Sequence, residues 1–133
     1  MPISVVIYAC QQAVPDPESL KVPLAGDAIR LQVVPEPCSS KVEAFQMLRT
    51  LATPVDLVWV IGCMENLCRY QEGSHRLAGR IAYTQRYLEE IGLETARLGR
   101  SLITPGDQDA LNAAIAEIKA QAQAVGPCPL RKD

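Results

Sequence analysis

Leu57-Val58-Trp59-Val60-Ile61-Gly62 is an apolar run that continues directly into the cysteine pair Cys63-Met64-Glu65-Asn66-Leu67-Cys68. With Val55 two residues earlier, the run is almost unbroken, as expected of a central parallel strand that helices cover on both faces. The segment from Val55 to Gly62 therefore predicts the middle strand of an α/β sheet. It also places two thiols just beyond the carboxyl end of that strand.

Three other segments have the composition of strands. Ile3 to Tyr8 and Ile29 to Val34 are rich in β-branched residues, and the pattern predicts a last strand from Arg97 to Ile103. The connection after the first strand contains several prolines, so we expect an ordered loop there with at most a short turn of helix.

Helices are expected after the second, third and fourth strands. Ser40 and Glu43 have the spacing of a capping box, and Gly92 stands where a left-handed residue should end the second of these helices. The third helix should follow the turn Thr104-Pro105-Gly106-Asp107. The positions expected to face the core are Ala44, Leu48 and Leu51 in the first helix, Leu77, Ile81, Thr84, Leu88 and Ile91 in the second, and Leu111, Ile115, Ile118 and Val125 in the third.

Strands that alternate with helices predict an α/β fold, a single small doubly wound and mostly parallel sheet of about four strands with helices on both faces. The chain has 133 residues, of which 48% are hydrophobic and 21% charged, and this size fits one domain with one core. We expect the α/β domain to span residues 1–126 and a flexible C-terminal tail to span residues 127–133.

Composition also limits the classes of partner. The net charge is −2 and aromatic residues make up 5% of the chain, so no nucleic acid is expected to bind. No segment approaches the roughly 20 apolar residues of a membrane helix, and no signal sequence precedes the first strand, so we expect a cytoplasmic protein without direct membrane insertion. Thiols stay reduced in that compartment. Five cysteines therefore favour metal binding or redox chemistry over a disulfide framework.

Four cysteines lie where a parallel sheet would bring them together. Cys10 follows the first strand, Cys38 follows the second, and Cys63 and Cys68 follow the third. Ligands of doubly wound sheets bind beyond the carboxyl ends of the strands, and thiolate sulfur suits iron or zinc. The Cys-x4-Cys spacing is like that of the first pair in plant-type ferredoxins, where four thiolates hold a 2Fe-2S cluster. The sequence therefore predicts a metal or iron-sulfur site with Cys10, Cys38, Cys63 and Cys68 as ligands.

Other interpretations of these cysteines stay open. The same four thiolates suit a zinc ion in a structural adaptor subunit without a redox role. Cys63 and Cys68 alone could cycle between dithiol and disulfide, and any single cysteine could be an ordinary buried core residue. Cys128, between two prolines of the tail, is expected to be an exposed and non-ligating thiol, and His75 a solvated side chain.

Positive charge is expected near the predicted site. The helices that begin near Ser40 and Gly73 would point their positive amino ends toward an anionic cluster, and Arg69 and Arg76 would add compensating charge. The surrounding arginines form either a docking face for an acidic partner or a solvated helix face; they are Arg69, Arg76, Arg80 and Arg86.

One stretch carries a family resemblance. Val60-Ile61-Gly62-Cys63-Met64-Glu65-Asn66-Leu67-Cys68-Arg69-Tyr70, and later Leu88-Glu89-Glu90-Ile91-Gly92-Leu93-Glu94, resemble the delta subunit of methyl-viologen-reducing hydrogenase. The resemblance includes Gly73, Ala78 and Arg80 and continues through Ile103, Asp107 and Val125-Gly126-Pro127, so it covers nearly the whole chain from about Ile29 onward.

The resemblance implies an electron-transfer subunit that holds a 2Fe-2S cluster and catalyses nothing alone. Its implied partner is a heterodisulfide-reductase-A-like FAD/iron-sulfur subunit in anaerobic, often flavin-based electron-bifurcating complexes. A further redox subunit of hydrogenase, formate dehydrogenase, methylene-tetrahydrofolate reductase or acyl-CoA reductase type is also compatible.

The ligand positions carry over one at a time. Cys63 and Cys68 match the family's paired ligands, Cys38 matches the cysteine after its second strand, and Cys10 matches the first cysteine of its amino-terminal motif. The family commonly has a second cysteine three residues later in that motif, where this chain has Ala13.

Overall fold

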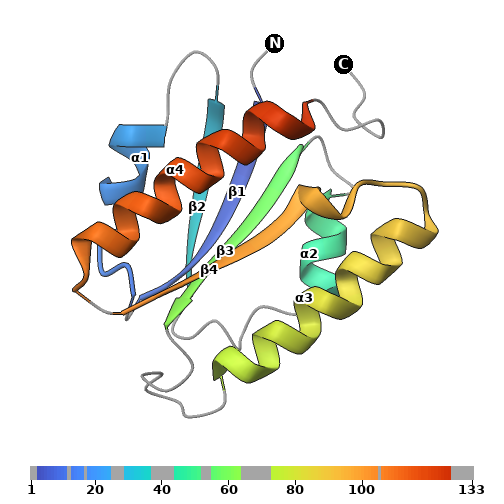
Figure 1. The fold of residues 1–133 in the computed structure, drawn as a ribbon, viewed down its shortest axis with the longest axis horizontal. Helices are drawn as coiled ribbons and strands as arrows, with labels where there is room; N and C mark the ends of the chain where they lie inside the picture. The colour runs from blue at the N-terminus through green and yellow to red at the C-terminus, as the bar shows by residue number, and fades with distance from the viewer. Residues whose placement is uncertain are drawn as a thin grey trace.

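The elements of the chain alternate between strand and helix from one end to the other (Figure 1). The computed structural model describes residues 3–11, 13–16, 18–24, 29–36, 44–51, 55–63, 73–104 and 106–126. In chain order these residues form β1 (Ile3–Cys10), α1 (Glu18–Leu24), β2 (Ile29–Glu36), α2 (Ala44–Leu51), β3 (Leu57–Cys63), α3 (Gly73–Glu90), a 3-10 helix (Thr95–Arg97), β4 (Leu98–Ile103) and α4 (Gln108–Val125).

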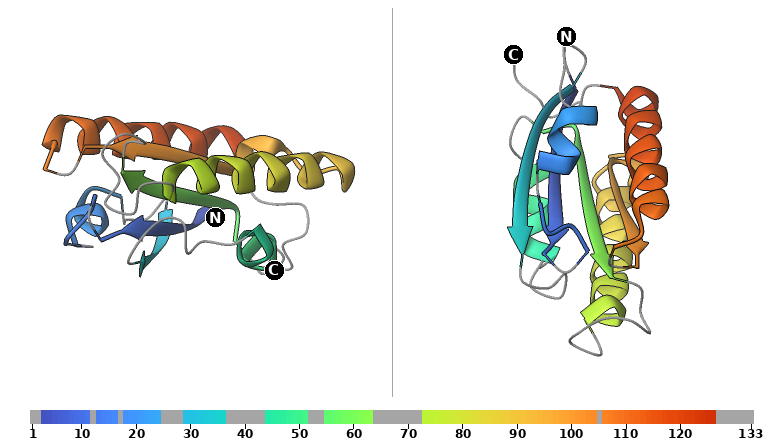
Figure 2. Two further views of the ribbon diagram at one scale, coloured as in Figure 1. Left: turned by 90° about the horizontal axis from the view of Figure 1, so that it is seen from below. Right: turned by 90° about the vertical axis from the view of Figure 1, so that its left-hand side faces the viewer.

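The sheet has the order β2-β1-β3-β4, and every neighbouring pair is parallel. Its two faces carry separate apolar clusters. One cluster joins the sheet to α1 and α4, and the other joins it to α2 and α3, as Figures 1 and 2 show from three directions. The predicted α/β fold with a parallel four-stranded sheet and helices on both faces is confirmed. Among the described residues, no helix combines the length and apolar character that a membrane span requires.

Strand alternation explains why β1 and β3 are apolar throughout. In β1, Val5 and Ile7 face α1 and α4, whereas Val6 and Tyr8 face α2 and α3. Both strands are central, so neither has a solvent-facing side that polar residues would occupy. This pattern predicts β3 correctly.

The start of β3 is tied to β1 by a buried carboxylate. β3 begins at Leu57, directly after the buried Asp56. Asp56 accepts a hydrogen bond from the backbone N–H of Ser4 at 2.8 Å, and the N–H of Asp56 donates to Ser4 O at the same distance. These two hydrogen bonds fix the first residues of the two strands relative to each other.

The connection after β1 contains more helix than the prolines predict. α1 spans seven residues with Pro23 inside it, where the sequence predicts at most a short turn. Leu20 and Leu24 are four residues apart and almost completely buried, at 0% and 3% exposure. Burial of these two side chains against the sheet offsets the backbone hydrogen bond that a proline removes from a helix.

α3 ends as its sequence predicts, although one core assignment fails. Gly92 has a positive φ of 84°. The N–H of Gly92 donates to Glu89 O and the N–H of Leu93 donates to Leu88 O, which is the hydrogen-bond pattern of a Schellman cap. Ile81, Thr84 and Leu88 are buried as expected, but Ile91 is 50% exposed because the helix has already ended at Glu90.

In α2 the buried face differs from the expected one. Met47 and Leu51 are buried, whereas Leu48 is only partly buried, so the helix is turned by about one residue from its predicted phase. The expected core positions Ala44 of α2 and Leu77 of α3 have side chains that lie outside the described residues.

α4 follows its predicted pattern except at its last residue. Leu111, Ile115 and Ile118 are buried as predicted, together with Ala122, but Val125 is only partly buried. Asp107 caps the helix by accepting a hydrogen bond from the N–H of Ala110 at 3.0 Å.

Arg97 does not start the last strand, as the sequence predicts, but ends a 3-10 helix with its side chain 1% exposed. Its guanidinium donates to the carbonyls of Asp56 at 3.1 Å, Gly126 at 2.9 Å and Val125 at 2.9 Å. It also donates to the carboxylate of Glu94, and this hydrogen bond and the charge of Arg97 lower the pKa of the Glu94 carboxyl, against a smaller opposing effect of burial. Arg97 therefore joins the end of α4 to the start of β3.

Replacing Arg97 with Met should lower the free energy of unfolding by at least about 3 kcal/mol, because three backbone carbonyls lose a charged donor. Urea unfolding followed by circular dichroism measures this change. The matched control is Arg86→Met on the exposed side of α3, which should stay within about 0.5 kcal/mol of the native chain. Equal stability of the two variants would contradict the role of Arg97.

Gly99 of β4 lies beneath the ring of Trp59, its partner in the β3–β4 register. A Cβ atom at this position would lie 2.8 Å or less from three atoms of the indole ring. Gly99→Ala should therefore displace the ring, weaken the 2.9 Å hydrogen bond from Trp59 Nε1 to Ser101 Oγ, and destabilise the fold by about 1–3 kcal/mol.

The fluorescence of Trp59, the single tryptophan, and urea unfolding report this change. Gly79→Ala is the matched control, because Gly79 is an exposed residue of α3 and an added methyl group there would have nothing within 4 Å. That substitution should leave the emission unchanged and stabilise α3 by about 0.5–1 kcal/mol. Native emission in Gly99→Ala would show that the predicted overlap does not occur.

Candidate cysteine site at the strand ends

The carboxyl ends of all four strands lie along one edge of the sheet, because the strands are parallel (Figure 1). β1 lies between β2 and β3. In the register, Cys10 pairs with Glu36 of β2, and Cys63 pairs with Ile103 of β4. Ala9 pairs with Ile61, so β1 and β3 end within about two residues of the same level. This edge is where the sequence predicts the thiols to converge.

Two of the four predicted ligands fall on described backbone. Cys10 is the last residue of β1 and Cys63 is the last residue of β3, so neighbouring strands each end in a cysteine. The side chain of Cys63 and all of Cys38 and Cys68 lie outside the described residues, as does Cys128. Cys38 comes two residues after the last residue of β2.

The convergence of four sulfur atoms therefore stays a prediction. Within the described ranges, no three His, Cys, Asp or Glu residues are grouped closely enough to hold a metal ion. What the structure adds is the adjacency of two of the strands that carry the predicted ligands.

The chain turns sharply just after Cys10. The N–H groups of Ala13 and Val14 both donate to the carbonyl of Cys10, at 3.1 Å and 2.8 Å, while the N–H of Gln11 continues the ladder to Glu36 O. Cys10, Ala13 and Val14 are each no more than 4% exposed and belong to the apolar cluster beneath α1 and α4. Such burial suits an ordinary core cysteine, and it would also keep water from a metal-bound thiolate.

An open hollow of about 270 Å³ adjoins this turn on the side of α1 and α4. Its lining includes two carboxylates, Asp16 and Asp107. Both already accept backbone hydrogen bonds, Asp16 from Glu18 and Asp107 from Ala110, each at 3.0 Å. Negative charge that is committed to helix capping disfavours an anionic group in this hollow.

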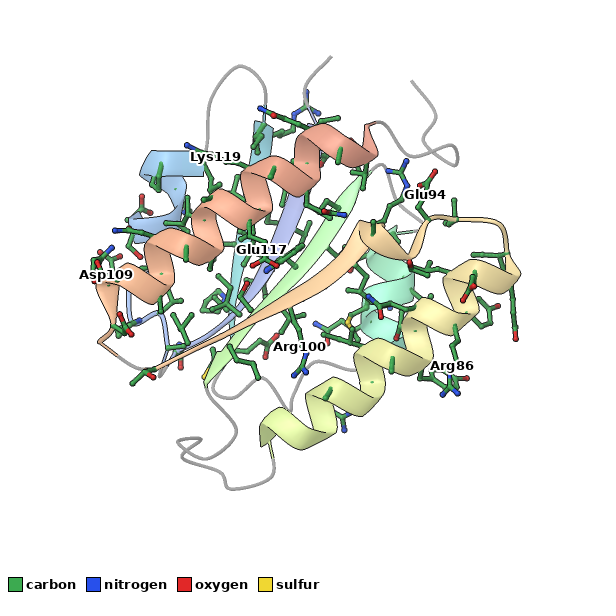
Figure 3. The ribbon with its side chains drawn as sticks, viewed as in Figure 1. Arg86, Glu94, Arg100, Asp109, Glu117 and Lys119 are labelled. Atoms are coloured by element: carbon green, nitrogen blue, oxygen red, sulfur yellow. The ribbon has the colours of Figure 1, made fainter. Side chains whose placement is uncertain are left out.

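The opposite face of the sheet carries positive charge near the same edge. Arg100 of β4 alternates with Leu98 and Leu102, which pack in the cluster beneath α2 and α3, and in Figure 3 its side chain points from β4 toward α3. Arg100 Nη1 is buried and has no hydrogen-bond acceptor in the part of the chain that the structure describes. Sequence reasoning missed this residue, although a single cation in the strand Leu98–Ile103 was a visible signal.

These features suit a thiolate-bound metal centre. Cysteine thiolates are soft anionic ligands, and a centre that they build carries net negative charge. A buried cation without an acceptor is the group that such a charge would stabilise. α3 begins directly after the segment that contains Cys68, so its positive amino end also lies at this edge.

Comparison with known families gives one match over nearly the whole chain. The family described as methyl-viologen-reducing hydrogenase, delta subunit, matches residues 5–126. The chain is 26% identical over 101 residues to the vhu iron-sulfur subunit of the F420-non-reducing hydrogenase of Methanocaldococcus jannaschii, covering 76% of this chain and 75% of that protein. It is 29% identical over 97 residues to the iron-sulfur subunit of the F420-non-reducing hydrogenase of Archaeoglobus profundus, covering 73% and 71%.

A second kind of relative is much longer than this chain. The A chain of the ferredoxin:CoB-CoM heterodisulfide reductase of Methanosarcina mazei is 26% identical over 97 residues, which cover 73% of this chain but only 12% of that protein. A region similar to this domain is therefore one small part of a larger polypeptide in that relative.

Proposed function

Because the chain belongs to the family of the delta subunit of methyl-viologen-reducing hydrogenase, as its sequence motifs predicted, we propose that it is an electron-transfer subunit that carries a 2Fe-2S cluster. Curated relatives are named as iron-sulfur subunits of a hydrogenase, which supports an iron-sulfur role. The structural observation that carries the proposal is the pair of adjacent parallel strands, β1 and β3, that each end in a cysteine.

We propose Cys10, Cys38, Cys63 and Cys68 as the cluster ligands. Cys10 and Cys63 extend from central strands, which hold ligand-bearing backbone more rigidly than a free loop would. The apolar cluster around Cys10 would exclude water from that ligand. When bound, a 2Fe-2S cluster accepts and releases one electron at a time, and the protein sets its potential through burial, charge and hydrogen bonds.

The proposed partner is a heterodisulfide-reductase-A-like flavoprotein subunit. Its support is the Methanosarcina mazei relative, in which a similar region and the remainder of a heterodisulfide reductase polypeptide share one chain. A separate subunit of this family is then expected to dock on the corresponding partner and to exchange electrons with it. The hydrogenase names of the shorter relatives favour a hydrogenase as the further redox module. The chain itself would transfer electrons without catalysing a reaction.

Protein purified or reconstituted without oxygen should contain iron and acid-labile sulfide in equal amounts, about two of each per chain. It should show visible absorption bands that bleach on reduction, and the reduced form should give an electron paramagnetic resonance signal. Metal and sulfide analysis with both spectroscopies measures this outcome. Colourless protein that holds one zinc ion and no sulfide would instead identify a structural zinc site, and a reversible Cys63–Cys68 disulfide without metal would identify a thiol redox protein.

Single serine substitutions test the ligand set. Cys10→Ser, Cys38→Ser, Cys63→Ser and Cys68→Ser should each lower the cluster content or change the absorption and resonance spectra, because serine replaces a soft thiolate with a hard oxygen. Cys128→Ser is the matched control and should keep the native iron content and spectra, since Cys128 lies outside the proposed set. Native spectra in any of the first four variants would remove that cysteine from the proposed set.

A further inference from the structure

We propose that Arg100 is a fixed counter-charge for the cysteine-bound cluster and that it raises the reduction potential of the cluster. This inference rests on the proposed function. A positive charge stabilises the reduced cluster more than the oxidised one, because reduction adds one negative charge. Arg100 would act through space and without ligating iron, so it is a positioning residue for charge.

The first support is the missing acceptor of Arg100. Its Nη1 atom is buried, and no acceptor for it exists among the residues that the structure describes. Buried polar groups almost always have a partner, and an unpaired buried charge is strongly unfavourable. Arg97 shows the usual solution in the same region of the chain, since its guanidinium donates to three carbonyls and a carboxylate. Arg100 therefore has hydrogen-bonding capacity that the described fold does not use.

The second support is position along the strands. Arg100 pairs with Val60, three residues before the pairing of Ile103 with Cys63. At about 3.3 Å per residue, the Arg100 backbone lies roughly 10 Å from the Cys63 backbone along the strand. Charges at this separation interact appreciably when protein and not solvent lies between them.

The third support is the absence of acidic residues in the facing part of α3. Gln85 Nε2 donates to Leu98 O at 2.8 Å, which places Gln85 beside the start of β4. α3 runs opposite to β4, so Arg100 faces the helix on the amino-terminal side of Gln85. The sequence Gly73–Gln85 contains no Asp or Glu, and the acidic residues of α3, Glu89 and Glu90, are exposed in its last turn. No carboxylate of α3 is therefore placed to neutralise Arg100.

The test compares the reduction potentials of cluster-loaded Arg100→Gln, Arg100→Lys and Arg86→Gln with that of the native chain. Arg100→Gln should make the one-electron reduction about tenfold less favourable, a fall of about 59 mV in the midpoint potential. Arg100→Lys keeps the charge and should recover at least half of that fall. Arg86→Gln removes an exposed charge on the outer side of α3 and should shift the potential little (Figure 3). Anaerobic redox titration followed by visible absorption measures all three.

The outcomes separate this inference from the proposed function. A native chain without iron and sulfide contradicts the proposed function itself. A fully loaded Arg100→Gln variant with the native potential, or an equal fall in Arg100→Lys, contradicts only the counter-charge. If folded Arg100→Gln loses the cluster while Arg100→Lys keeps it, the requirement for charge is supported, and loss in both folded variants overturns it.

Discussion

The parallel pairing of β1 with β3 determines where chemistry can occur in this chain. Because each strand is buried on both faces, neither can shift its register without exposing apolar side chains or moving them to the wrong layer. The pairing of Val5 with Leu57 at one end therefore fixes the level at which Cys10 and Cys63 leave the sheet at the other. Placement of the two cysteines is a consequence of core packing, and the cysteines themselves need not contribute to the stability of the fold.

Two polar devices secure the opposite end of the same strands. The Asp56 carboxylate accepts the N–H of Ser4, and Arg97 joins the Asp56 carbonyl to the carbonyls of Val125 and Gly126. These contacts connect the start of β3 to β1 and to the end of α4. Rigid attachment at the amino ends of the strands leaves the carboxyl ends available for ligands, which is the general arrangement of parallel α/β sheets.

Local patterns predicted most of the fold, because each helix and strand has its own periodicity. The unbroken run of β3 indicated a central strand, and Gly92 marked the end of α3. What failed depended on tertiary contacts: Leu20 and Leu24 stabilise a helix despite Pro23, and Arg97 is buried by carbonyls distant in sequence. For the candidate site, sequence predicted that Cys10 and Cys63 end strands that lie side by side, but not the buried guanidinium nitrogen of Arg100, which depends on how α3 packs over β4.

Arg97 and Arg100 show how the same side chain can have opposite roles three residues apart. Arg97 is fully supplied with acceptors, so its charge is neutralised locally and contributes to holding elements together. Arg100 lies under α3 with an unused donor, so its charge extends toward the strand ends. The hollow on the other face has the opposite sign, with Asp16 and Asp107. The edge of the sheet is therefore electrically asymmetric, and an anionic centre built from cysteines would be favoured on the side of α3.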